Sequence, residues 1–140
     1  MGIRKVLVTG GAGYIGSHFV DGLIARDYEV VVLDSLVPQV HRSGTWPSYI
    51  NSRASYIQGD VRDREVFQPL IQVADAVVHF AAAVSIGQSM YEIDHYVDSN
   101  TRGTALLLDI LVNKSHQVQK VIVASSIGVY GEGAYECEVH

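Results

Sequence analysis

Three glycines at regular spacing, Gly10, Gly13 and Gly16, follow a short apolar run in the segment VTGGAGYIG. Glycine at the first position permits a tight turn, at the second it lets the backbone approach a ligand, and at the third it lets the following helix pack on the strand. The N–H groups that open such a helix point toward the ligand and attract phosphate. The spacing is therefore typical of a loop that binds the pyrophosphate of a dinucleotide.

An acidic residue, Asp34, ends the next apolar segment, close to the roughly 20-residue spacing expected after such a loop. A carboxylate at this position can accept hydrogen bonds from the adenosine ribose, and it repels a 2′-phosphate. The alternative is an ordinary turn residue beside a glycine loop that binds nothing. Because the two features are independent and agree, we predict a cofactor site that prefers NAD to NADP.

The segment GDVRD supplies a third feature of the same site, Asp60 and Val61, directly after another strand-like run. Asp60 can pair with the exocyclic amine of an adenine, and Val61 offers a backbone contact. Asp60 as a simple turn residue is the alternative. We expect Asp63 to be the N-cap of the next helix, because aspartate accepts hydrogen bonds from the first free N–H groups.

A serine pair, Ser125 and Ser126, follows the apolar run VIVA near the end of the sequence. A hydroxyl at a strand end is chemically inert without a neighbouring base, so the pair alone does not define an active site. Its meaning depends on what the rest of the chain builds.

Strand-like and helical segments alternate along the chain and must position these residues. Four short segments are apolar throughout, and a fifth is weaker: KVLVTG, EVVVLD, DAVVHFAAA, KVIVASS and, weaker, ASYIQGD. Continuous apolarity predicts strands buried on both faces of a parallel sheet. The alternation predicts one α/β domain with right-handed crossovers over residues 1–140.

Helical spacing is clear in three places. The apolar stripe of the first helix consists of Ile15, Phe19, Val20, Leu23 and Ile24. A second helix covers residues 66–71, where Pro69 should bend or shorten it. The third and longest runs from about residue 93 to residue 112. Residues 37–53 show no clean period, and we expect an irregular excursion there.

Composition excludes several classes of partner. The 140 residues carry ten basic and fifteen acidic side chains, a net charge of −5, without a basic stripe, which argues against nucleic acid. No apolar run approaches the roughly 20 residues that cross a bilayer, and the N-terminus lacks a signal-peptide pattern. A single cysteine, Cys137, fits a reducing, cytoplasmic setting. Cys137 and His140 without a second pair are insufficient for a metal site, so we predict none.

Together the motifs resemble those of the extended short-chain dehydrogenase/reductases. The similarity is greatest to the NAD-dependent sugar-nucleotide epimerase/dehydratase family, which includes the UDP-glucose 4-epimerases. The matching motifs, in order, are TGGAGYIGSH, LD at Asp34, GDVRD, HFAA, NTRGT and SSIGVYGEG. The resemblance covers nearly the whole chain. It implies a Rossmann-type doubly wound parallel sheet of about five strands in the order 3-2-1-4-5, truncated relative to the family.

The resemblance also implies cofactor contacts. Tyr14 and Ile15 would cover the pyrophosphate, while Phe80, Ala81 and Ala82 would line the groove at the end of the fourth strand.

Other strand and helix positions have expected roles as well. We expect His79 to be a packed strand residue rather than a ligand. In the family Asn100 helps to tie the long helix to the active-site strand and the cofactor; a structural role and a direct contact both remain open. Gly103 would let this helix approach the strand closely.

The resemblance gives the serine pair a role. Ser126 would be the catalytic hydroxyl, and Ser125 would contact the cofactor. In the family chemistry a tyrosine, its pKa lowered by a lysine in a Y-x-x-x-K motif, takes a proton from a sugar hydroxyl while a hydride passes to the nicotinamide. Here Tyr135 is followed four residues later by Val139.

The missing motif leads us to expect a cofactor-binding portion without its catalytic tyrosine, lysine and substrate region. We therefore expect NAD(H) binding, and a nucleotide sugar only if a missing region completes the site. We also expect self-association, as a homodimer or a heterogeneous oligomer. A free-standing NAD-binding regulatory or sensor module is the alternative function. A third arrangement is two chains that complete one site together.

Overall fold

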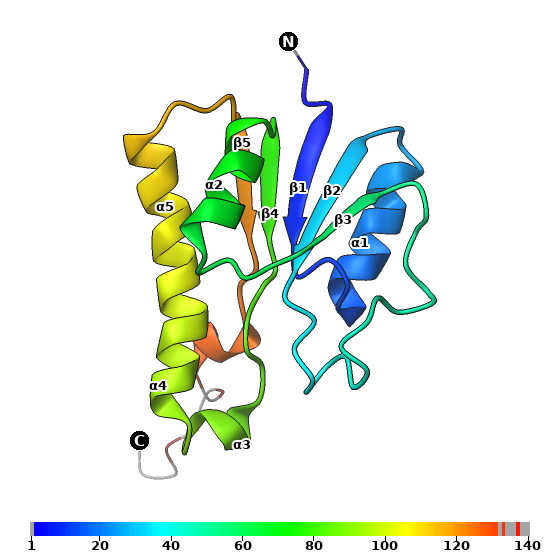
Figure 1. Cartoon of the computed structure of the whole chain (residues 1–140). Helices are drawn as coiled ribbons and strands as arrows, with labels where there is room; N and C mark the ends of the chain where they lie inside the picture. Colours follow the sequence, from blue (N-terminus) through cyan, green and yellow to red (C-terminus); the bar gives the residue numbers. More distant parts are fainter. Residues whose placement is uncertain (1, 132, 134–136, 138–140) are drawn as a thin grey trace.

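The computed structural model describes residues 2–131, 133 and 137 and contains a five-stranded parallel sheet (Figure 1). The strands are β1 (Lys5–Thr9), β2 (Glu29–Asp34), β3 (Ser55–Gln58), β4 (Ala76–His79) and β5 (Lys120–Val123). Their order, β3-β2-β1-β4-β5, confirms the predicted doubly wound α/β fold. β1 lies at the centre, and its residues Val6, Leu7 and Val8 are buried, as continuous apolarity requires.

Helices cover the two faces of the sheet unequally (Figure 1). On one face α1 (Tyr14–Ile24) packs on Val6, Val8 and Val32. On the other face α2 (Arg64–Gln72) and α5 (Gly103–Asn113) cover a core that includes Leu7 and Leu33. Both core clusters contain residues of the central strands, and neither contains a residue of β5.

The buried side of α1 differs from the predicted stripe at one position. Gly16, Val20 and Ile24 are the buried residues of this helix, whereas Ile15 is 67% exposed. The helix packs directly on the glycine loop through Gly16, so its buried side centres on this residue and turns Ile15 outward.

Local signals set both ends of α2. The Asp63 carboxylate accepts the N–H of Glu65, which confirms the predicted N-cap. Pro69 lies within the helix, which ends at Gln72. Proline removes one helical hydrogen bond, and a short helix is the expected consequence.

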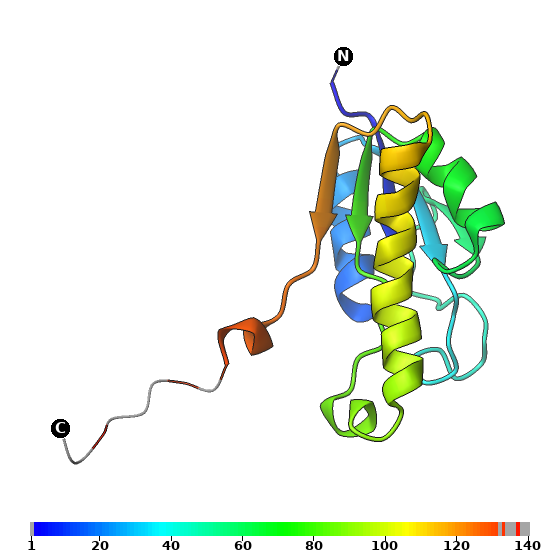
Figure 2. The same cartoon turned by 90° about the vertical axis from the view of Figure 1, so that its left-hand side faces the viewer.

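The predicted third helix is not uniformly α-helical. α4 (Ile93–Tyr96) continues into a π-helical segment, η1 (Val97–Arg102), and then into α5, and the three form one continuous rod (Figure 2). The predicted helix over residues 93–112 is therefore present, with a π-helical segment that the spacing did not predict. π-Helical turns are rare and occur frequently at functional sites. A short helix, α3 (Ile86–Ser89), joins β4 to this rod.

Two segments lie outside the sheet and its helices. Residues 37–53 form the irregular excursion that we predicted, made of turns and bends. After β5 the chain leaves the sheet and reaches a 3-10 helix, η2 (Ile127–Tyr130) (Figure 2). Among the helices described, none has the length and apolarity to cross a bilayer.

Candidate functional site

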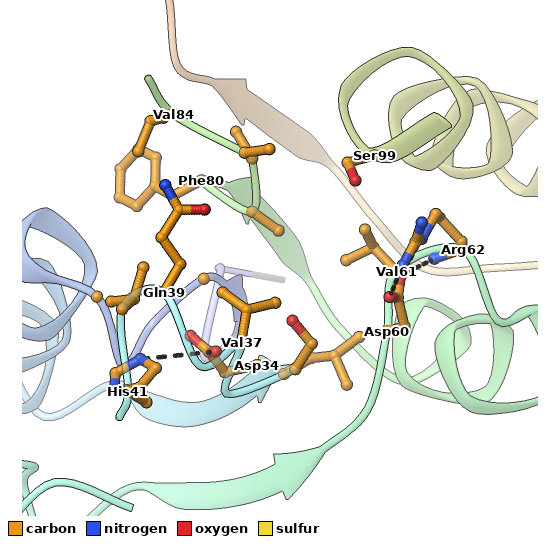
Figure 3. A pocket seen from close by; sticks show the side chains of 18 of the residues that line it. Asp34, Val37, Gln39, His41, Asp60, Val61, Arg62, Phe80, Val84 and Ser99 are labelled. Atoms are coloured by element: carbon orange, nitrogen blue, oxygen red, sulfur yellow. Dashed lines mark hydrogen bonds and ion pairs between the residues drawn. The ribbon is translucent and has the colours of Figure 1, made fainter. Parts of the chain in front are cut away.

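A cavity of about 340 Å³ opens at the carboxyl ends of β1, β2, β3 and β4. Its lining consists of Gly10, Gly13 and residues 33–35, 37–41, 59–62, 80–84, 95 and 99. In Figure 3 Asp34 and His41 lie on one side of the cavity, and Asp60 and Arg62 lie on another. Open parallel sheets bind ligands at this edge, where the strand order reverses, and the volume is in the range of small-molecule sites.

The glycine loop has the geometry that its sequence predicts. Gly10 has a φ of +68°, and a Cβ there would lie 2.8 Å from the backbone nitrogen of Ala81. A Cβ on Gly16 would collide with the carbonyl of Gly10, which explains the close approach of α1. A Cβ on Gly13 would meet only the Gly10 carbonyl, at 3.4 Å. Gly13 thus borders the cavity without a side chain.

The Asp34 carboxylate, only 9% exposed, is held in place by backbone groups on both oxygens. The N–H of Ala12 donates to Oδ2 at 3.0 Å, and the N–H of Leu36 donates to Oδ1 at 2.9 Å. Leu36 has a φ of 52°, an uncommon conformation for a non-glycine residue. Because a carboxylate has about four acceptor positions, these two N–H groups occupy about half of those of Asp34.

Residues of the irregular excursion support the same region. His41 is buried, and its Nε2 lies 3.9 Å from Oδ1 of Asp34. The hydroxyl of Tyr49 donates to the carbonyl of Ala12 at 2.8 Å. The Ala12 residue of the glycine loop is therefore fixed through its N–H by Asp34 and through its carbonyl by Tyr49.

Asp60 lines the cavity, and its carboxylate is paired with Arg62. Arg62 donates to it three times: its backbone N–H and Nε reach Oδ1 at 2.8 and 2.9 Å, and Nη2 reaches Oδ2 at 2.5 Å. The hydrogen bonds from Arg62 hold the pKa of Asp60 below its usual range, so this carboxyl is ionised at neutral pH.

The other end of Arg62 contacts the long helix. Its Nη1 donates to Oδ2 of Asp98 at 2.5 Å, and Arg102 donates to Oδ1 of Asp98 at 3.1 Å. Hydrogen bonds from these two arginines lower the pKa of Asp98, and the hydrogen bond from Arg102 has the larger effect. An alternating network of two carboxylates and two guanidinium groups therefore joins the loop after β3 to η1.

Asn100 has the structural partners that a half-buried amide needs. Its Oδ1 accepts the N–H of Ala83 at 2.7 Å, and its Nδ2 donates to the carbonyl of the same residue at 3.0 Å. This pair fixes the segment after β4 to the π-helical segment. Gly103 is also buried, but a Cβ there would meet Val61 at 2.7 Å. The start of α5 therefore approaches the loop after β3 closely, rather than the active-site strand as predicted.

A chain of hydrogen bonds passes through His79, a buried strand residue as predicted. Thr104 donates its hydroxyl proton to the Asn100 carbonyl, so it accepts from His79 Nε2 at 3.2 Å. Nδ1 of His79 then accepts from Thr9 at 2.8 Å, and Thr9 accepts the N–H of Ala81 at 3.2 Å. Burial lowers the pKa of His79, which agrees with a neutral ring.

The predicted site residues thus fall into three groups. Gly10, Gly13, Asp34, Asp60, Val61, Phe80, Ala81 and Ala82 line the cavity. Gly16 and Asn100 do not line the cavity but contact residues that do, Gly10 and Ala83. Tyr14 and Ile15 are exposed at the start of α1 and do not line it, so their contact with a pyrophosphate stays a prediction.

The serine pair lies apart from this cavity. Ser125 and Ser126 follow β5, are exposed, and are not among its lining residues. Tyr135 and His140 lie outside the described residues. Within the part of the chain that is described, no group of three or more histidine, cysteine or acidic side chains is arranged to hold a metal ion.

Sequence reasoning missed three residues of the site, His41, Tyr49 and Arg62. Arg62 stands in the motif GDVRD between two aspartates, and this was the one available signal. His41 and Tyr49 lie in the excursion without periodicity, where spacing predicts no contacts.

Comparisons with known proteins agree with this geometry. The family model described as "NAD dependent epimerase/dehydratase family" matches residues 6–139. The chain is 36% identical over 135 residues to a dTDP-L-rhamnose 4-epimerase from Burkholderia thailandensis, covering 95% of this chain and 37% of that protein. It is 41% identical over 130 residues to a UDP-glucose 4-epimerase from Streptococcus mutans, covering 90% of this chain and 37% of that protein.

A solved structure has the same architecture. A UDP-glucose-4-epimerase from Stenotrophomonas maltophila, with bound NAD and formylated UDP-arabinopyranose, superposes with a TM-score of 0.80 at 37% identity. The match covers 96% of this chain and 40% of that one. The chain therefore spans about two fifths of the length of these relatives.

Proposed function

The chain belongs to the NAD dependent epimerase/dehydratase family, and we propose that its cavity binds NAD as the cofactor site of a sugar-nucleotide epimerase. The observation that carries this proposal is the cavity itself. It brings the glycine loop, Asp34 and Asp60 together at one edge of the sheet, although they come from three separate crossovers.

Each part of a dinucleotide has a matching group in this cavity. The pyrophosphate would lie on the glycine loop, where Gly13 leaves room and the N–H groups of α1 begin. The adenosine ribose would use the remaining acceptor positions of Asp34. The adenine would lie beside Asp60 and Val61, and the nicotinamide half would extend past Phe80 toward Ala81 and Ala82, where small side chains leave space.

Cofactor choice follows from the charge of Asp34. Its carboxylate is buried and already accepts two N–H groups, so a 2′-phosphate would meet a fixed negative charge. We propose a preference for NAD over NADP on this basis. When bound, NAD supplies reversible hydride transfer, and the residues described here bind and orient it.

The reaction and substrate are carried over from the relatives. Both curated relatives named above are sugar-nucleotide 4-epimerases. In this chain Ser126 is the candidate hydroxyl for the reacting oxygen. No tyrosine of the sequence is followed four residues later by lysine. We therefore propose that this chain alone binds the cofactor without turning over a sugar nucleotide. We also propose a reducing, cytoplasmic setting, which the single cysteine favours.

Self-association is part of the proposal. The long helical rod carries exposed apolar side chains on its outside, at Ile93, Val97, Leu108 and Val112. Exposed apolar surface of this kind favours association. We propose a homodimer through this helix, and a sharp monomer in light scattering at high protein concentration would count against it.

Titration calorimetry with NAD, NADH and NADP tests the central claim. We expect heat of binding and a thermal shift with NAD, and weaker binding of NADP. No heat and no shift at millimolar NAD would overturn the proposal. NADP binding that is tighter than NAD binding would overturn only the assignment of Asp34.

A further inference from the structure

Arg62 joins two parts of the site that are distant in the sequence, the loop after β3 and the π-helical segment η1. Its guanidinium is divided between two carboxylates, Asp60 and Asp98 (Figure 3 shows the Asp60 contact). Arg62 lines the cavity, and its side chain is about one third exposed (31%).

The hydrogen bonds of Asp60 leave little freedom for a ligand. A carboxylate has about four acceptor positions. Arg62 uses two on Oδ1, through its backbone N–H and Nε, and one on Oδ2, through Nη2. One acceptor position remains on Oδ2, and the side-on pair with the guanidinium fixes the plane in which this position lies.

From this geometry we propose that Arg62 is a positioning residue for the base of the dinucleotide: it orients Asp60 so that the remaining acceptor of Oδ2 selects a base with an exocyclic amine. The inference rests on the proposed NAD site. Asp98 has a supporting role, because it holds the guanidinium from the opposite side and links its orientation to the long helix.

Lysine cannot replace arginine in this role. An ammonium keeps the positive charge but lacks the planar fork that contacts both oxygens of Asp60 and a second carboxylate together. Arg62→Lys therefore removes the orientation of Asp60 by the guanidinium while it keeps the positive charge. Arg62→Gln, which also removes the charge, is a second variant.

Arg64 provides a matched control in the same segment. Its Nη2 contacts Oδ2 of Asp109 at 2.5 Å and joins α2 to α5, but it does not line the cavity. Arg64→Lys breaks the same type of arginine–carboxylate contact at a nearby place in the fold, between α2 and α5. A general loosening of the structure would appear in both lysine variants, whereas loss of base selection would appear only at position 62.

The experiment measures the affinity for NAD and for nicotinamide hypoxanthine dinucleotide, in which a carbonyl replaces the exocyclic amine. We expect the unmodified chain and Arg64→Lys to prefer NAD by about tenfold or more, as for a hydrogen bond to a charged group. In Arg62→Lys and Arg62→Gln the preference should fall below about threefold, mainly through weaker NAD binding.

Each outcome decides between the alternatives. Unchanged preference in both Arg62 variants, or equal weakening of both dinucleotides, would overturn the positioning role and leave Arg62 as a structural link. Failure of the unmodified chain to bind either dinucleotide would instead overturn the proposed function. Far-ultraviolet circular dichroism and urea unfolding of every variant identify any loss of folding.

Discussion

The cavity at the ends of β1–β4 and the segment that follows β5 differ in how firmly their side chains are held by hydrogen bonds and packing. In the cavity, Asp34, Asp60 and their neighbours have fixed partners from distant parts of the chain. In β5, by contrast, Val121, Ile122 and Val123 are 37–50% exposed, and none belongs to either core cluster. The contacts among the described residues thus fix the groups that line the cavity, while Ser125 and Ser126 follow a strand whose residues are partly exposed.

The fixed partners of the cavity residues favour ligand binding there. Preformed hydrogen bonds lower the cost of ordering a binding site, because the site does not have to be arranged when the ligand arrives. The same reasoning predicts that substitutions around the cavity have large effects and that substitutions beyond β5 have small effects on cofactor binding.

The largest effect is expected at Gly10, in the glycine loop that borders the cavity. Alanine there would have to adopt a φ of +68° with its Cβ 2.8 Å from the Ala81 nitrogen. We expect Gly10→Ala to lower the free energy of unfolding by about 3 kcal/mol, as the sum of a left-handed conformation and an overpacked contact. Urea unfolding measures this change.

Gly87→Ala is the control for this substitution. A Cβ at Gly87, in α3, would meet no atom within 4 Å. Its effect should stay within about 0.5 kcal/mol. Equal effects of the two alanines would show that the glycine loop is not the rigid element described here.

A smaller effect on stability, but a specific one on binding, is expected at Asp34. Asp34→Ala removes the acceptors for the ribose and the negative charge that opposes a 2′-phosphate. We expect NAD binding to weaken by about 1–2 kcal/mol and the difference between NAD and NADP to narrow. Calorimetry with both cofactors measures this, and an unchanged difference would remove Asp34 from the specificity site.

His79, at the end of β4, lies between the two regions and predicts a pH dependence. Its folded pKa lies below the ordinary value of 6.5 because the ring is buried. As the pH falls below about 6.5, the unfolded chain binds a proton that the folded chain does not. The free energy of unfolding should therefore fall, by at most about 1.4 kcal/mol per pH unit, until the folded pKa is reached.

Comparison with His79→Gln isolates this contribution from those of the other histidines. Glutamine can donate and accept hydrogen bonds but does not titrate in this range. Urea unfolding at pH 7 and pH 5.5 should show a smaller loss of stability in the variant than in the unmodified chain. An equal loss in both would mean that His79 is not the group responsible.

The sequence predicted those parts of the site that depend on neighbouring residues. The glycine loop, Asp34 and the Asp63 cap are encoded by short, contiguous patterns, so spacing was sufficient to identify them. The strand order followed from the motifs and their resemblance. Ile15 was misplaced because spacing gives the apolar stripe of a helix but not which side of it is most closely packed.

The remaining features depend on distant contacts. Every residue of η1 is compatible with an α-helix, and the π-helical turn coincides with the contact of Asn100 with Ala83, 17 residues earlier. Arg62 has acidic neighbours on both sides in the sequence, but its second partner, Asp98, lies 36 residues away. No local pattern selects that partner.

The smallest effect on binding is expected at Ser126, in the segment that follows β5. Ser126 is exposed, lies beyond the end of β5 at Val123, and does not line the cavity. Ser126→Ala should therefore leave the NAD affinity within about twofold of the unmodified chain. A loss comparable to that of Asp34→Ala would show that the serine segment closes on the cofactor and that the two regions act together.

The same variant also tests whether the chain turns over a sugar nucleotide. A positioned proton-transfer group contributes about 10²–10⁴-fold to a rate, and the sequence contains no Y-x-x-x-K motif to supply it. We expect neither the unmodified chain nor Ser126→Ala to show product or a change in NADH absorbance with UDP- or dTDP-sugars. Turnover that disappears in Ser126→Ala would mean that another group acts as the base, and Ser126 would then be catalytic in this chain despite its exposed position.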